Sequence, residues 1–292
     1  MATEMTNVTD IIPTPEAASD AEARVAPATD GDADPLALTT ERESSTSSAA
    51  PGEASAALGR VDTPAEAASE QAAYDPSRYE RPSVTVDVVI LTMRRRRLEA
   101  LLVKRRHWPF EGMWAIPGGF VNPDESLEDS ARRELAEETN VRDVYLEQLY
   151  TFGDPGRDPR TRVITVVYYA LIRAEQLPGM VRAGDDAAEA GWFPVYRLPP
   201  MAFDHDNILT YTMQRLRGKL EYTSIGFQLL PPEFTLSELQ EVYEAIMNRQ
   251  LDKRNFRKKV LSTGILEPTA NTRNFVRHRP AALYRFSPRA ES

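Results

Sequence analysis

Runs of β-branched, aliphatic and aromatic residues, separated by polar turns, occupy the middle of the chain. Such runs are typical of strands. They predict five strands, at Ser83–Thr92, Leu98–Arg105, Tyr145–Phe152, Arg162–Arg173 and Trp192–Pro194. The basic run Arg94–Arg97 lies between the first two and predicts a solvated hairpin tip, which we favour over a nucleic-acid patch.

Two segments show helical spacing instead. One helix is expected at Leu127–Glu138, with Ser126 as its N-cap, and a second at Phe203–Lys219, ending at about Gly218. Loops are expected at 117–119 and 153–160, which contain glycine and proline. Strands that alternate with only two long helices predict a mixed sheet with helices packed on it.

The C-terminal part has a different pattern. Thr235 and Glu238 fit a capping box before a helix. Its apolar face is expected to contain Leu236, Leu239, Tyr243 and Ile246. Asp252 would cap a second helix, Lys253–Ser262, which Gly264 helps to end. A polar, basic loop would lie between two strands, Ile265–Pro268 and Ala281–Phe286. The boundary before this unit is predicted at Leu220–Pro232, which contains two adjacent prolines.

The charge is unevenly distributed along the 292 residues. Residues 1–77 carry 15 acids and 3 bases, a net of −12, and residues 1–73 contain no aromatic side chain. This composition predicts disorder. Residues 249–290 carry 11 Lys or Arg and 2 acids, a net of +9. We therefore expect a disordered acidic tail at 1–78, one domain at 79–222 and a basic domain at 223–292.

Composition also excludes several classes of protein. The chain has no cysteine and three scattered histidines, which excludes a disulfide framework and makes a histidine zinc centre improbable. We find no signal-peptide pattern and no apolar run near the roughly 20 residues that span a bilayer. The expectation is a cytoplasmic protein that does not contact a membrane.

Three carboxylates stand out on the first predicted helix. Glu134, Glu137 and Glu138 are spaced i, i+3 and i+4, so they project from one helical face. Carboxylates crowded in this way repel unless a cation neutralises them. Oxygen ligands suit Mg²⁺ or Mn²⁺, and such ions suit a pyrophosphate. Arg133 and Glu125 are placed to pair and to fix the helix against the preceding loop.

The spacing of these residues resembles the Nudix box, G-x5-E-x7-R-E-U-x-E-E-x-G-U, where U is aliphatic. The matching positions are Gly119, Glu125, Arg133, Glu134, Leu135, Glu137, Glu138 and Val141. Asn140 stands where the family has glycine, and asparagine tolerates the left-handed conformation that ends a helix. The resemblance implies a Nudix α/β/α sandwich that binds a nucleoside diphosphate linked to another group.

This resemblance also implies roles for particular residues. Metal ligation would fall to Glu134, Glu137 and Glu138, with the carbonyl of Gly118, and Arg133 and Glu125 would complete the catalytic set. The general base stays open between Glu134 and the acids Asp185, Asp186 and Glu189. The ligand would meet Lys104, Arg105, Arg106, Trp114 and Gly119, although these cations and this ring fit a framework role equally well.

The second C-terminal helix carries a cationic face. Phe256 and Val260 share one side, while basic and polar residues share the other. A helix of this kind followed by a basic hairpin is typical of a winged helix, whose recognition helix enters the major groove and whose wing reaches phosphates. The candidate DNA-binding residues are Lys253, Arg254, Asn255, Arg257, Lys258, Arg273, Arg277 and Arg279.

A Nudix box followed by this unit resembles the Nudix-related transcriptional regulators of NAD metabolism. The segments 251–259 (LDKRNFRKK) and 279–286 (RPAALYRF) look like that family's C-terminal domain. The resemblance implies a homodimeric repressor that binds double-stranded DNA and releases it when ADP-ribose or a related nucleotide occupies the Nudix domain. Because every box carboxylate is present, a magnesium-dependent hydrolase of ADP-ribose or a related nucleotide stays open. A Nudix-fold interaction protein with neither activity is a third alternative.

Overall fold

The computed structural model of the chain describes residue 75 and residues 78–177, 187–275 and 278–287. Two units divide the chain. One falls within 15–80 and is described only at residues 75 and 78–80, where Arg78 and Asp75 form an ion pair of 3.8 Å. The acidic tail predicted at 1–78 therefore lies almost wholly outside the described residues. The other unit runs from Arg81 and holds the elements below.

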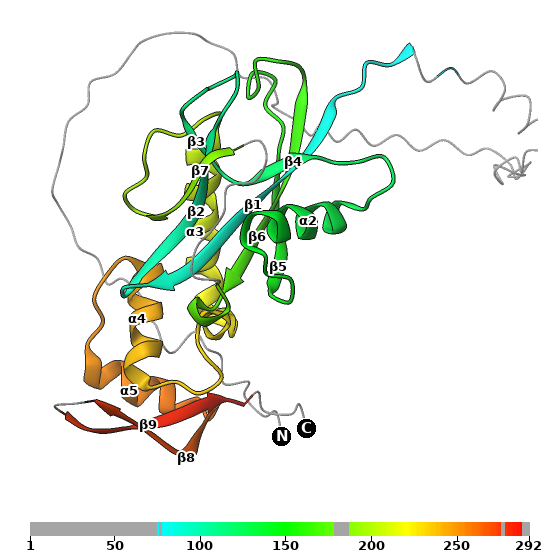
Figure 1. Ribbon diagram of the computed structural model, residues 1–292. Helices are drawn as coiled ribbons and strands as arrows, with labels where there is room; N and C mark the ends of the chain where they lie inside the picture. Colours follow the sequence, from blue (N-terminus) through cyan, green and yellow to red (C-terminus); the bar gives the residue numbers. More distant parts are fainter. Residues whose placement is uncertain (1–74, 76–77, 178–186, 276–277, 288–292) are drawn as a thin grey trace, which may run out of the picture. The chain divides into compact units, whose positions relative to one another are not determined.

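Seven strands form the main sheet (Figure 1). They are β1 (Ser83–Arg94), β2 (Arg97–Arg105), β3 (Trp114–Ala115), β4 (Gly118–Phe120), β5 (Tyr145–Phe152), β6 (Val163–Ile172) and β7 (Ala187–Pro194). The order is β3-β2-β1-β6-β5, with β4 paired to β1 and β7 to β2. Because β1 and β6 are parallel and the other pairs antiparallel, the predicted mixed sheet is confirmed.

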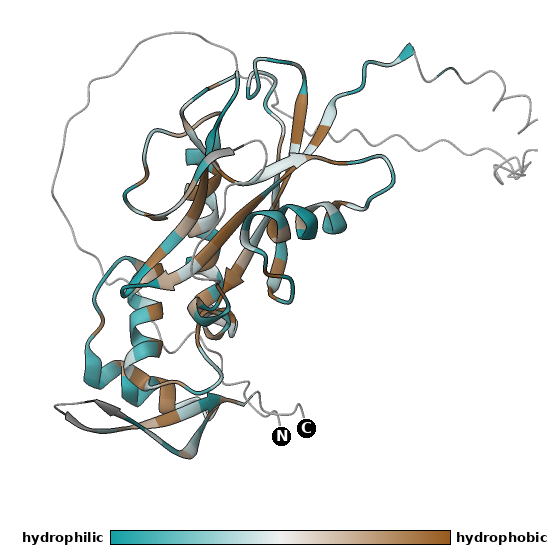
Figure 2. Cartoon of the chain, viewed as in Figure 1, coloured by the Kyte–Doolittle hydropathy of each residue, from teal (hydrophilic) through white to brown (hydrophobic). Residues whose placement is uncertain are grey.

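Helices cover both faces of this sheet. On one face, Val86, Val88 and Ile90 of β1 pack with Ala131 and Leu135 of α2 (Leu127–Thr139). On the other face lies α3 (His205–Tyr222), which shares a core with the alternate residues of β1. A strand buried on both faces reads as a continuous apolar run, which is the pattern that predicted β1. Figure 2 shows these apolar stretches on the strands.

The C-terminal elements are α4 (Leu236–Met247), α5 (Lys253–Ser262), β8 (Leu266–Phe275) and β9 (His278–Phe286). The capping box is confirmed: Glu238 N–H donates to Thr235 Oγ1 at 3.2 Å, and Thr235 N–H donates to Glu238 Oε2 at 2.8 Å. Asp252 caps α5 as predicted by accepting from Asn255 N–H at 2.7 Å. The predicted apolar face of α4 is buried.

Three boundaries differ from the prediction. The expected loop at 117–119 contains β4, because glycine lets its backbone approach β1: a Cβ on Gly118 would lie 2.4 Å from Val86 O. Helix α3 continues to Tyr222, since Leu220 is buried in the core and holds the last turn. The hairpin β8–β9 extends into the expected loop, because a two-stranded ribbon with an exposed face needs little apolar patterning.

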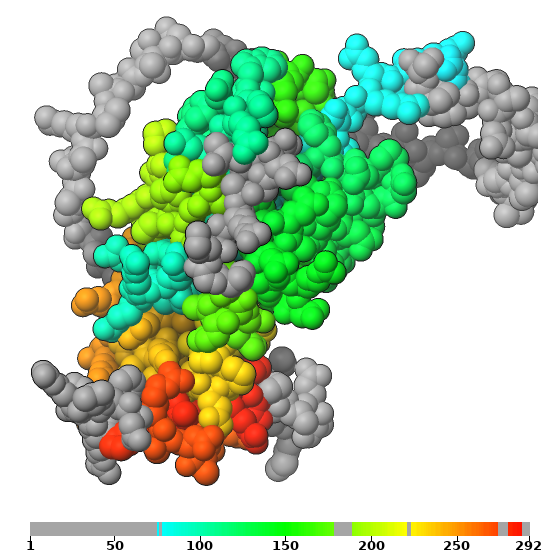
Figure 3. Space-filling model, in the orientation of Figure 1, coloured from blue at the N-terminus to red at the C-terminus, as the bar shows by residue number. Residues whose placement is uncertain are grey.

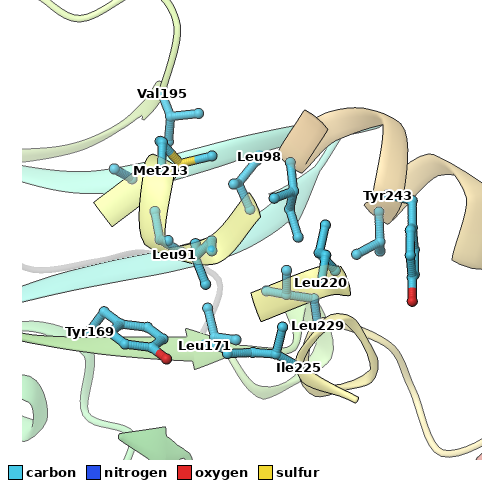
Figure 4. Close-up of a cluster of buried hydrophobic side chains, with 14 of the residues drawn as sticks. Leu91, Leu98, Tyr169, Leu171, Val195, Met213, Leu220, Ile225, Leu229 and Tyr243 are labelled. Carbon is cyan, nitrogen blue, oxygen red and sulfur yellow. The ribbon is translucent and has the colours of Figure 1, made fainter. Parts of the chain in front are cut away.

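The predicted boundary segment at 220–232 is a packed connection. It contains a 3₁₀ helix, η4 (Ile225–Leu229), whose apolar residues are buried with those of α4 and the sheet (Figure 4). Tyr196 Oη and Arg217 Nε both donate to Ile246 O, at 2.6 and 3.1 Å, and so cap the end of α4. One continuous core thus joins the sheet to the C-terminal elements. No described helix is long and apolar enough to cross a membrane.

Candidate functional site

The box helix α2 has defined ends. Asp129 N–H donates to Ser126 Oγ at 3.1 Å, which confirms the predicted N-cap. Asn140 adopts φ 57° and ψ 24°, and its N–H donates to Ala136 O at 2.8 Å. Asparagine therefore takes the left-handed position as predicted. The box carboxylates lie in the C-terminal half of this helix.

The predicted pair between Arg133 and Glu125 is confirmed. Arg133 donates from Nε and Nη2 to the two oxygens of Glu125, at 3.1 and 2.8 Å. Asn122 N–H also donates to this carboxylate at 2.9 Å. The hydrogen bonds from Arg133, and then from Asn122, lower the pKa of Glu125 to about 2. This bidentate pair fixes the loop that follows β4 against α2.

Glu134 is buried at the centre of the box. Arg133 Nη1 donates to Glu134 Oε1 at 2.7 Å and lies 3.6 Å from Glu137 Oε1. Burial raises the pKa of Glu134, and the negative charges of Glu137 and Asp87 act in the same direction, whereas Arg133 opposes them. A Cβ on Gly119 would lie 2.2 Å from Glu134 Oε1. The Glu134 carboxylate therefore packs against the backbone of Gly119 and would have to move to make room for a side chain there.

The box side chains are hard oxygen donors of the kind that Mg²⁺ or Mn²⁺ accepts. Within the described ranges, however, no group of three or more acidic or histidine side chains is already arranged around a common metal position. Arg133 supplies the counter-charge to Glu134 and Glu137, while Glu137 is exposed and Glu138 half-buried. Arg133 contacts one oxygen each of Glu134 and Glu137, and the assignment of metal ligands stays a prediction.

Sequence reasoning missed a buried ionic cluster beside the box. Arg157, whose side chain is 4% exposed, donates to both oxygens of Asp204 at 3.0 and 2.7 Å. Its Nη2 also lies 3.8 Å from Asp87 Oδ2, which accepts from Thr165 Oγ1 at 2.7 Å. A Cβ on Gly118 would lie 2.4 Å from Asp87 Oδ1. The cluster ties β1 to the 153–160 loop and to the start of α3.

His205 belongs to this cluster. Its Nδ1 accepts from Ile116 N–H at 2.9 Å, and its Nε2 lies 3.9 Å from Asp87 Oδ1. Complete burial lowers the pKa of His205; Asp87 opposes this shift, while the nearby Arg157 adds to it. Neutral His205 therefore fixes the backbone at Ile116, just before the box, by accepting its N–H. A single histidine in a sequence carries no signal of such a role, because its partners lie far away along the chain.

The predicted ligand-binding residues fall into two groups. Lys104 Nζ lies 3.7 Å from Glu189 Oε2 and 5.8 Å from the ring of Trp114, which packs edge-on against Phe193 at 4.6 Å. Strand pairing explains this group, since β2 lies between β3 and β7. Glu189 is thus engaged by Lys104, and the other two base candidates, Asp185 and Asp186, lie outside the described residues.

The second group stacks cations on aromatic rings. The guanidinium groups of Arg105 and Arg160 lie 4.8 and 5.8 Å from the ring of Phe203, and Arg160 also lies 5.5 Å from the ring of Phe120. Arg105 Nε donates to Pro109 O at 2.6 Å, and Arg106 is exposed. Sequence reasoning missed Arg160 and both phenylalanines. These residues connect the end of β2 to β4, next to Gly119.

Helix α5 has the two faces that the sequence predicted. Phe256 and Val260 are buried, whereas Lys253, Arg254, Asn255 and Lys258 are exposed. Arg257 differs from these, because its Nη2 donates to Ser237 Oγ at 3.1 Å. Its guanidinium therefore lies between α5 and α4 instead of joining the exposed cationic face.

The hairpin arginines are only partly described. Arg273 forms an ion pair with Glu238 and donates to Glu233 O at 3.2 Å, so it secures β8 against the start of α4. The side chains of Arg277 and Arg279 lie outside the described residues. Of the predicted wing residues, Arg273 therefore contacts its own domain.

The fold and the box geometry define the class of protein: a Nudix domain joined to a winged helix. Residues 81–212 match the model of the NUDIX domain, and residues 226–286 match that of the NrtR DNA-binding winged helix domain. The chain is 37% identical over 224 residues to the ADPR responsive transcriptional repressor NtrR of Acinetobacter baylyi, covering 75% of this chain and 89% of that protein. The chain therefore belongs to the NrtR family, as the sequence predicted.

Two further relatives match most of the chain and about half of it, respectively. The structure of Shewanella oneidensis NrtR complexed with a 27mer DNA is 37% identical, with a TM-score of 0.62, and the match covers 70% of this chain and 94% of that one. The ADP-ribose pyrophosphatase of Methanocaldococcus jannaschii is 38% identical over 140 residues, 48% of this chain and 78% of that protein. The Nudix domain is thus similar to that of an enzyme as well as to that of a repressor.

Proposed function

We propose that this chain is a DNA-binding repressor whose Nudix domain senses ADP-ribose or a related nucleotide, and that it controls genes of NAD metabolism. The observation that supports it most is the joining of an intact Nudix box to a winged helix with an exposed cationic helix in one chain. The two sites belong to one packed unit, which a ligand-controlled repressor requires.

Helix α5 is the proposed recognition helix. Lys253, Arg254, Asn255 and Lys258 are exposed on the side away from Phe256 and Val260. Lysine and arginine bind phosphates or guanine edges, and asparagine reads adenine, when a helix lies in the major groove. The β8–β9 hairpin would act as the wing, through the predicted residues Arg277 and Arg279. Arg257 would hold α5 against α4 through its hydrogen bond to Ser237.

The Nudix domain is the proposed nucleotide site. Glu134, Glu137 and Glu138 would hold a divalent cation, Mg²⁺ or Mn²⁺, which offsets the charge of a pyrophosphate. Lys104, Arg105 and Trp114 would contact the nucleotide. Release of DNA requires that the bound nucleotide favour a state with lower DNA affinity, because a ligand shifts an equilibrium only by its differential affinity. The shared core connects the two sites through α3 and η4.

We also propose a homodimer. A repressor with one recognition helix in each subunit reads two half-sites about one helical turn apart. Multi-angle light scattering on the full chain tests this proposal: the expected mass is twice 32.8 kDa. A monomer that binds a two-half-site operator no better than a single half-site would contradict it.

Fluorescence anisotropy tests the regulator proposal directly. Labelled DNA from upstream of the gene is titrated with the full chain in the presence of Mg²⁺, and ADP-ribose is then added. We expect saturable binding that ADP-ribose reverses. A Lys258→Gln variant should bind more weakly, whereas the matched control Arg215→Gln, an exposed arginine of α3, should bind normally. Equal binding by wild type and both variants would remove α5 from the interface.

A hydrolase that cleaves ADP-ribose is the second candidate, because all box carboxylates are present and Glu134 is held in a buried position. Its test is the release of AMP from ADP-ribose with Mg²⁺, followed by chromatography. Under this candidate, the wild type releases AMP, and its anisotropy signal recovers as the ADP-ribose is consumed. The Glu138→Gln variant releases no AMP. A lasting release of DNA without any AMP would leave only the sensor.

A further inference from the structure

A groove separate from the Nudix box lies where the β1–β2 hairpin meets the C-terminal elements. Its volume is about 450 Å³, and its walls include the hairpin tip, the turn after β7, and the outer side of α4 with the turn that follows. Figure 3 shows the blue-green hairpin tip against the orange surface of α4. Neither the box nor the exposed face of α5 contributes to it.

Arginines are the most frequent residues in the lining of this groove. Four of them, Arg96, Arg97, Arg197 and Arg249, face two acids, Glu241 and Glu244. Arg96 Nη2 lies 2.8 Å from Glu241 Oε1 and pairs its charge, whereas Glu244 Oε1 accepts from the neutral groups Gln240 Nε2 and Leu251 N–H. The lining therefore keeps a net positive charge. Among the described residues, the guanidinium groups of the other three arginines form no ion pair.

The hairpin tip itself indicates a reason for these arginines. Arg95 and Arg96 form the two-residue turn between β1 and β2, with φ of 48° and 62°. A turn with both central residues in the left-handed region normally takes asparagine and glycine, because other side chains are strained there. Strained residues cluster where function requires them. Two arginines in this turn therefore favour a function of the tip that needs positive charge.

We propose that this groove binds a small phosphate-bearing anion, independently of the nucleotide in the Nudix domain. Guanidinium groups form bidentate hydrogen bonds with phosphate oxygens, and three of them without an acidic partner line the groove. The volume lies within the range of small-molecule sites, about 300 to 1,000 Å³. Because its walls come from both the sheet domain and α4, a bound anion holds these parts in the arrangement seen here.

Inorganic pyrophosphate is the probe, titrated calorimetrically into the full chain in EDTA so that the carboxylate box holds no metal. We expect binding that weakens about tenfold or more in the double variant Arg197→Gln/Arg249→Gln. The matched control is Arg142→Gln/Arg215→Gln, which removes the same charge from exposed positions outside the groove. It should bind as the wild type does.

Three results would overturn the proposal. The first is no binding at millimolar pyrophosphate, and the second is an equal loss of affinity in the control variant. The third is an Arg197→Gln/Arg249→Gln protein that still binds pyrophosphate but no longer binds DNA, which would assign these arginines to DNA. A second variant, Arg95→Asn/Arg96→Gly, relieves the turn strain but removes the cation that pairs with Glu241, so the unpaired carboxylate should weaken pyrophosphate binding while the protein keeps its thermal stability. Unchanged affinity in a folded Arg95→Asn/Arg96→Gly protein would likewise overturn a role of the tip.

Discussion

Replacing Arg157 by methionine tests whether the buried ionic cluster holds the Nudix domain together. The guanidinium is 4% exposed and donates to both oxygens of Asp204, while Asp87 lies 3.8 Å away. Methionine keeps much of the apolar stem but leaves two largely buried carboxylates without their cation. Removing one partner of a buried ion pair costs about 3–5 kcal/mol. We expect a loss near the lower value, since the Asp204 side chain is 18% exposed.

Urea unfolding followed by tryptophan fluorescence measures this loss. The control is Arg132→Met, which breaks the exposed Glu128–Arg132 pair of 2.7 Å on α2. That pair should contribute only about 0.3–0.5 kcal/mol to the free energy of unfolding. The double variant Arg157→Met/Asp204→Asn should be less destabilised than the sum of its single variants, because the two side chains interact.

A small effect of Arg157→Met would refute this reasoning. If its free energy of unfolding falls by less than about 1 kcal/mol, similar to Arg132→Met, the carboxylates must be solvated or protonated at little cost. Additive single and double variants would lead to the same conclusion. Since a domain is stable by only about 5–15 kcal/mol, the expected loss is large enough to measure without ambiguity.

Three further predictions follow from other contacts. Burial lowers the pKa of His205 below its usual 6.5, so the unfolded chain takes up a proton at a higher pH than the folded chain does. The free energy of unfolding should therefore fall as the pH drops below about 6.5, by up to roughly 1.4 kcal/mol per pH unit. In urea unfolding at pH 5.5 and 7.5, His205→Gln should reduce this dependence on pH. Gly118→Ala should lower the melting temperature more than Gly119→Ala, because its Cβ would meet a backbone carbonyl whereas that of Gly119 meets the movable Glu134 carboxylate; equal shifts would contradict the geometry. Lys258→Gln should reduce the slope of log affinity for DNA against log salt by about 1, and an unchanged slope would show that this lysine contacts no phosphate.

Local sequence patterns were sufficient for much of this protein. The capping box at Thr235 and Glu238, the cap at Asp252 and the left-handed end at Asn140 depend on residues within a few positions of one another. The pair between Arg133 and Glu125 follows from the spacing of the box. A continuous apolar run predicted the strand β1, because both faces of this strand are buried.

Contacts between distant segments were decided only by the tertiary structure. Arg157 meets Asp87 and Asp204, which are 70 and 47 positions away, and no local pattern marks such a cluster. Arg257 and Arg273 looked equivalent to the exposed cations, yet they contact Ser237 and Glu238 of α4.

The same distinction holds for the segment at 220–232. The sequence suggested a boundary at 220–232, because adjacent prolines are typical of one, but packing against the sheet and α4 made it part of the core. The sequence alone was sufficient for the main helices and long strands, the box and the family, since these depend on residue types at fixed spacing. Only the folded chain decided which charges are paired, because pairing depends on the neighbours that packing brings together.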